Sequence, residues 1–105
     1  MEELVTTRKE MKMMISEMQT ELRTQGFEDG FDRRVRVKVT TDSENVGIEF
    51  PELYRGKKHS SDYEPHVTAS LECGRVVVSL GTAWGDCNDI QFWYNRTTNK
   101  WEVLD

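Results

Sequence analysis

Apolar residues near the start of the chain recur every three or four positions, and apolar residues farther on alternate with polar ones. The first pattern places side chains on one face of an α-helix, and the second places them on one face of a β-strand. The sequence therefore predicts a helix from about Glu3 to about Gln25, ended by Gly26, and then a sheet. The helical apolar positions are Leu4, Met11, Ile15, Met18 and Leu22.

Packing has to stabilise this helix, because it has no pair of opposite charges three or four residues apart. We expect its Met, Ile and Leu side chains to cover one face of the sheet. The alternative is that part of this stripe pairs with a second copy, so that the chain is either a monomer or a homodimer through the N-terminal helix. Methionine suits both roles, because its flexible side chain fills cores and adapts to binding surfaces.

A first hairpin is predicted where valines alternate with basic residues and then, after a polar turn at 41–44, where apolar residues alternate again. This pattern predicts that Val37 pairs with Ile48 on the buried face. On the outer face it predicts that Arg36 lies opposite Glu49.

Four further alternating segments complete the pattern, at residues 67–73, 76–80, 90–94 and 101–103. Gly74 followed by Arg75 is typical of a two-residue type II′ turn between the first two of them, which places the Cys73 thiol on the buried face. The predicted fold class is α+β: one long N-terminal helix packed on one face of a mainly antiparallel sheet of five or six strands, joined by meander-like hairpins. No linker separates two cores, so residues 1–105 form a single domain.

Charge is unevenly distributed along this acidic chain, whose net charge is −5. Residues 33–58 carry 7 basic and 4 acidic side chains, between two acidic ends. Phosphate backbones repel such a chain unless a local basic face overcomes the net charge. Two cysteines are too few for a disulfide framework, the first residues lack a signal-peptide pattern, and no apolar run reaches the about 18 residues of a membrane span. We expect a cytoplasmic protein that does not enter a membrane.

The residues that could bind a metal lack the close spacing of known metal motifs. They are His59, His66, Cys73 and Cys87. Asp86, Asn88 and Asp89 are better explained by turn formation than by calcium binding. There is also no glycine-rich phosphate loop and no nucleophile motif. We therefore expect no metal, no cofactor and no enzymatic activity.

A candidate partner-binding surface consists of basic and aromatic residues on the outer sheet face and in two long loops. These residues are Arg34, Arg36, Lys38, Tyr54, Arg55, Trp84 and Trp93. The row of basic residues has three alternative interpretations. It keeps a solvated strand from pairing with another strand, it binds an acidic protein surface, or it binds nucleic acid.

Two of the tryptophans differ in their expected environment. Trp101 follows the inward period and belongs to the core, whereas Trp93 lies between inward residues and faces outward. An exposed tryptophan is a common interface anchor. The alternative is that Trp84 or Trp93 packs under a loop or a neighbouring strand.

Acidic residues on the predicted helix suggest a different kind of surface. Glu3, Glu10 and Glu17 recur every seven residues, about 10.5 Å apart. Together with Glu21, Glu28 and the acidic turn after the helix, they could imitate a row of DNA phosphates. An ordinary solvated helix face has the same appearance.

The sequence as a whole is most consistent with a non-enzymatic interaction module that binds a protein partner, as an inhibitor or adaptor, with a nucleic-acid enzyme as one such partner. One alternative is direct nucleic-acid binding through Arg34, Arg36 and Lys38. A second is an acidic DNA mimic. The third is an enzyme or small-ligand carrier with a pocket between helix and sheet.

Overall fold

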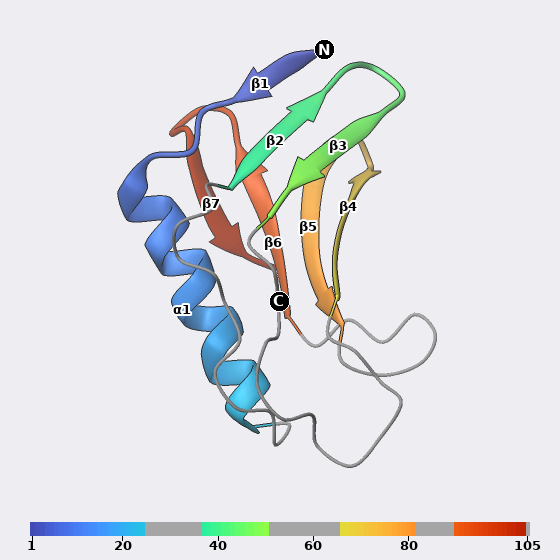
Figure 1. Ribbon diagram of the computed structural model, residues 1–105. Helices are drawn as coiled ribbons and strands as arrows, with labels where there is room; N and C mark the ends of the chain where they lie inside the picture. The colour runs from blue at the N-terminus through green and yellow to red at the C-terminus, as the bar shows by residue number, and fades with distance from the viewer. Residues whose placement is uncertain (25–36, 51–65, 82–89, 105) are drawn as a thin grey trace.

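A computed structural model of the chain describes residues 1–24, 37–50, 66–81 and 90–104. It confirms the α+β class: the described residues form one helix and two antiparallel sheets (Figure 1). In chain order the elements are β1 (Glu2–Leu4), α1 (Arg8–Thr24), β2 (Lys38–Thr41), β3 (Val46–Glu49), β4 (His66–Glu72), β5 (Arg75–Gly81), β6 (Ile90–Asn95) and β7 (Lys100–Val103).

The prediction of a single sheet of five or six strands is wrong, because the described residues form seven strands in two sheets. The strands form a three-stranded sheet, in the order β1-β2-β3, and a four-stranded sheet, in the order β4-β5-β6-β7. β3 contacts β4 but does not pair with it. The core explains the arrangement, because one buried cluster contains residues of both sheets, such as Val39 and Phe92, together with residues of α1 such as Met18. Two sheets that share a core bury two apolar faces at once. The predicted meander is confirmed in β4–β7.

The chain begins with a strand, and the prediction that the helix starts near Glu3 is wrong. Leu4 is buried, but it lies in β1 opposite Val39. The helix starts after Thr7, whose side-chain oxygen accepts a hydrogen bond from the Glu10 backbone N–H at 3.2 Å and whose carbonyl accepts one from Met11 at 2.9 Å. A threonine at this position satisfies an N–H group that the first turn leaves without a helical partner, so it ends the strand segment and begins the helix.

α1 is rotated relative to the predicted stripe. Its buried residues are Glu10, Met14, Met18, Gln19 and Leu22, whereas Met11 and Ile15 are only partly buried. Met14 and Met18 belong to the core of their own chain, so a homodimer that used Met18 would have to expose it. Within the described part of the chain, no helix has the length and apolar character to cross a membrane.

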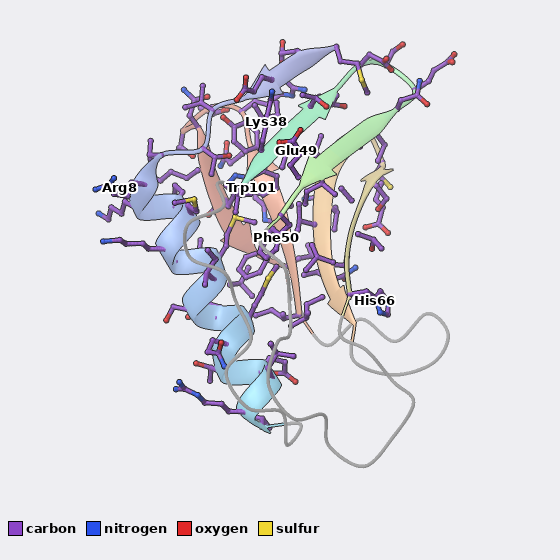
Figure 2. The ribbon with its side chains drawn as sticks, viewed as in Figure 1. Arg8, Lys38, Glu49, Phe50, His66 and Trp101 are labelled. Carbon is purple, nitrogen blue, oxygen red and sulfur yellow. The ribbon has the colours of Figure 1, made fainter. Side chains whose placement is uncertain are left out.

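The carboxylate of Glu10 connects α1 to the edge of the four-stranded sheet. It is buried, and its Oε2 accepts a hydrogen bond from the backbone N–H of Trp101 at 2.9 Å. Trp101 lies in β7, the last strand of its sheet, and Figure 2 shows it facing the helix. A strand edge displays N–H groups that lack a strand partner. Glu10 therefore satisfies an edge group that would otherwise be buried without a partner.

Replacement of Glu10 by alanine is expected to lower the free energy of unfolding by about 2 kcal/mol, because it leaves a buried N–H without its charged acceptor. Urea unfolding followed by circular dichroism measures this loss. Glu17→Ala is the matched control, because Glu17 is exposed on the same helix. Glu10→Gln keeps an acceptor and should lose less. Equal losses in the two alanine variants would contradict the assigned role of Glu10.

The register of the first hairpin differs from the prediction by two residues. Val39 pairs with Ile48, and Lys38, not Arg36, lies opposite Glu49. The turn occupies residues 42–45, because Asp42 Oδ1 accepts hydrogen bonds from the backbone N–H groups of Glu44 and Asn45, each at 2.8 Å. These backbone hydrogen bonds to the ionised form lower the pKa of the Asp42 carboxyl.

The second hairpin has the predicted two-residue turn, but one position earlier. Glu72 pairs with Arg75, so Cys73 and Gly74 form the turn. Both have positive φ, 52° and 77°, which defines a type I′ turn, not type II′. Cys73 is therefore exposed at the turn, and its predicted burial is wrong.

Candidate interaction surface

Trp93 lies on the outer face of the four-stranded sheet. Its β6 neighbours Phe92 and Tyr94 are buried in the core, so Trp93 points to the opposite face, as the alternation predicts. The strand registers place it in a row with Val77 of β5 and Glu102 of β7. Trp93 is half-buried. Among the described residues it is the large aromatic side chain of this face.

Arg75 stacks on Trp93. Its guanidinium carbon lies 5.0 Å from the centre of the Trp93 ring, a distance typical of a cation–π contact. Arg75 is exposed, and beneath the pair Val77 is only 1% exposed. A guanidinium that stacks on an aromatic ring keeps its in-plane N–H donors available for a carboxylate. The pair therefore combines an apolar surface with a fixed positive charge.

Two polar pairs brace the strands on either side of Trp93. Gln91 Nε2 donates to Ser79 Oγ at 3.0 Å, which joins β6 to β5. Asn95 Nδ2 donates to Glu102 Oε2 at 2.8 Å, which joins β6 to β7. These cross-strand hydrogen bonds join the strands around Trp93 and give its surface a polar border.

A second aromatic pair supports the same strands from the core side. The rings of Tyr94 and Trp101 lie 4.9 Å apart at 63°, an edge-to-face contact, and Trp101 Nε1 donates to Thr6 Oγ1 at 3.3 Å. The Tyr94 hydroxyl donates to Asn99 Oδ1 at 3.2 Å. Burial raises the pKa of the Tyr94 hydroxyl above its ordinary value, which favours the neutral form that donates this hydrogen bond. The β6–β7 hairpin is thus held on both faces.

Only two of the predicted partner-binding residues lie in the described part of the chain, Lys38 and Trp93. The others, which are Arg34, Arg36, Tyr54, Arg55 and Trp84, lie outside the described residues. Lys38 is exposed on β2 opposite Glu49 of β3 (Figure 2). Because Lys38 and Trp93 belong to different sheets, the structure does not join them in one continuous strand surface.

The acidic row that could imitate DNA is not formed. Glu3 lies in β1 and pairs with Thr40, so it is not part of the helix. Glu10 is buried and bonded to Trp101. Of the three glutamates, only Glu17 remains exposed on α1. The predicted seven-residue row is therefore wrong, while Glu28 and the acidic turn of the mimic alternative lie outside the described residues.

A groove of about 920 Å³ runs along α1. Its described lining has three basic residues, Arg8, Lys12 and Arg23, and no acidic one. Gln19 also lines it; this side chain is buried, and its Nε2 has no hydrogen-bond partner among the described residues. The described part of this groove therefore presents positive charge and one unpaired amide donor, which suit an anionic group that accepts a hydrogen bond.

The structure describes two of the four predicted metal-binding residues, His66 and Cys73, and does not bring them together. His66 begins β4 and Cys73 follows its end, so about 23 Å of extended strand separates them. His59 and Cys87 lie outside the described residues, as do Asp86, Asn88 and Asp89. Among the residues that the structure describes, no group of three or more His, Cys, Asp or Glu side chains could hold a metal ion.

Comparison of the chain with protein-family models, with curated proteins and with solved structures found no match. The arrangement of side chains is therefore the basis for assigning a function. Sequence reasoning identified Trp93 but missed Arg75, which it assigned to a turn. The available signal was that Arg75 falls on the same outward period as Val77.

Proposed function

We propose that the chain is a non-enzymatic interaction module that binds a protein partner, as an inhibitor or an adaptor, through the outer face of the β4–β7 sheet. The observation that carries this proposal is the Arg75–Trp93 pair. Tryptophan and arginine are the residue types most enriched among side chains that dominate binding energy at protein interfaces. The braced polar residues around the pair supply the polar rim of such an interface.

The proposed compartment is the cytoplasm. The exposed free thiol of Cys73 supports a reducing environment, because free thiols are retained there and tend to oxidise elsewhere. A partner in the cytoplasm is the class to search first.

The test begins with identification of the partner by cross-linking and mass spectrometry in an extract of the native source. Trp93→Ala and Arg75→Ala should each raise the Kd for that partner about tenfold or more, measured by isothermal titration calorimetry. Val103→Ala is the matched control, because Val103 is an exposed apolar residue on the opposite face of the same sheet. Its Kd should stay unchanged.

Two outcomes would overturn the proposal. One is a Kd that is the same in Trp93→Ala as in the unmodified chain. The other is a nucleic-acid ligand whose affinity falls steeply with salt and with Lys38→Glu but not with Trp93→Ala, since phosphate binding depends on cations and not on an aromatic anchor. That second result would favour direct nucleic-acid binding through Arg34, Arg36 and Lys38.

A further inference from the structure

The four strands at sheet edges differ in length and in how their edges are protected. β1 has three residues, and β3 and β7 have four each, whereas β4 has seven. The edge of β7 is occupied by Glu10 of α1. β4 lies at the end of its sheet with β5 on one side (Figure 1). A long regular strand at an edge is a template for pairing with another chain.

Within its own seven residues β4 lacks the interruptions that usually prevent such pairing, and β3 contacts it without pairing with it. Between His66 and Glu72 it contains no proline and no basic residue. Its register with β5 runs without a bulge from one end to the other. Natural edge strands are commonly interrupted by lysine, proline or a bulge. The sequence of β4 therefore permits another strand to pair with it.

The hydrogen-bonding pattern identifies which residues display free backbone groups. In a two-residue hairpin the residues that flank the turn form a hydrogen-bonded pair, here Glu72 and Arg75. Because such pairs alternate, the N–H and C=O groups of Val67, Ala69 and Leu71 point away from β5.

The opposite end of the sheet gives the same pattern. The N–H of Trp101 points away from β6 toward Glu10, and the N–H of Leu104 bonds to the carbonyl of Gln91. In each strand the backbone groups of successive residues point alternately to the two neighbouring strands. Followed from β7 through β6 and β5, this alternation again makes the backbone groups of the odd-numbered β4 residues point away from β5. Among the described residues, the outward groups of Val67, Ala69 and Leu71 have no strand partner.

The sequence of β4 complements itself in one antiparallel register. With Ala69 opposite Ala69 of a second copy, all three outward residues meet outward residues, which makes about six backbone hydrogen bonds. Val67 then lies opposite Leu71 on the core face. Thr68 lies opposite Ser70 on the outer face. At the two ends His66 lies opposite Glu72, so no two like charges face each other.

We propose that the chain forms a homodimer in which β4 pairs antiparallel with β4 of a second copy, about a twofold axis at Ala69. The two four-stranded sheets become one continuous sheet, and the two Arg75–Trp93 pairs lie on the same outer face. This interface differs from a dimer through α1 and does not depend on the proposed protein partner. A twofold interface must complement itself, and in this register the outward backbone groups of β4 meet one another without opposing like charges.

Sedimentation equilibrium of the full chain over a range of concentrations tests the proposal. The unmodified chain should have the mass of a dimer. A variant with both Thr68→Lys and Ser70→Lys should show a dimer dissociation constant raised about tenfold or more, because it places like charges opposite each other. Both side chains are exposed on the outer face, so the variant is expected to keep its circular dichroism spectrum.

Two controls make the test specific. Thr97→Lys with Thr98→Lys adds the same charge at exposed positions of the β6–β7 turn and should leave the dimer intact. A second β4 variant, Thr68→Glu with Ser70→Glu, should form a mixed dimer with the lysine variant, seen by native mass spectrometry. A monomer at every concentration, or a dimer that the β4 substitutions do not weaken, would overturn the proposal.

Discussion

Replacement of Trp101 by alanine is expected to lower the free energy of unfolding by about 3–5 kcal/mol, the range for removal of a large aromatic side chain from a core. Trp101 is 2% exposed. The substitution removes its edge-to-face contact with Tyr94 and its hydrogen bond to Thr6. Because small domains are stable by only about 5–15 kcal/mol, the variant should unfold at a much lower urea concentration. Chemical denaturation followed by circular dichroism measures the change.

Trp93→Ala is the matched control for this experiment. It removes the same residue type from the same sheet, but from the outer face, where the ring is half-buried. Its stability loss should be clearly smaller, and its main effect should be on binding. Trp101→Phe keeps part of the aromatic contact and should recover part of the loss. If both alanine variants lost the same stability, the assignment of one tryptophan to the core and the other to the surface would be wrong.

The second large effect is expected at Met18, in the middle of the buried face of α1. Met18→Ala should cost about 2–5 kcal/mol, because the side chain is fully buried in the cluster that joins α1 to both sheets. The free energy of unfolding from urea titrations is again the measurement. Met13→Ala is the control, since Met13 has the same side chain on the same helix and is only partly buried.

Unchanged stability in Met18→Ala would contradict the placement of α1 against the core. It would also restore the alternative of a homodimer through the helix stripe, which is distinct from pairing through β4. Native mass spectrometry of the variant with Thr68→Lys and Ser70→Lys separates these two dimers, because only the β4 dimer depends on residues 68 and 70.

The strands were predictable because their signal is local. Alternation of apolar and polar residues identified the segments that became β2 to β7, and the inward position of Trp101 and the outward position of Trp93 followed from the same period. β1 was missed, since three residues are too few to show a period. Its boundary was nevertheless encoded: Thr7 and Glu10 have the spacing of a helix-capping pair, which begins the helix after residue 7.

The candidate site was only partly predictable. The period assigned Trp93 to the outer face, but no local rule pairs it with Arg75, because these residues are 18 positions apart and meet only once β5 and β6 adopt their register. The burial of Glu10 was not predictable from local sequence either. A glutamate on a predicted helix is expected to face solvent, yet here it is buried against the edge of β7.

Periodicity in the chain was thus sufficient for the kind of element at most positions and for the face on which each side chain lies, since both depend on the geometry of a few consecutive residues. The division of the strands into two sheets, the registers, the rotation of α1 and the contact between Arg75 and Trp93 came from packing. They depend on which apolar faces bury one another, and that choice is made between segments far apart in the sequence, where no short pattern records it.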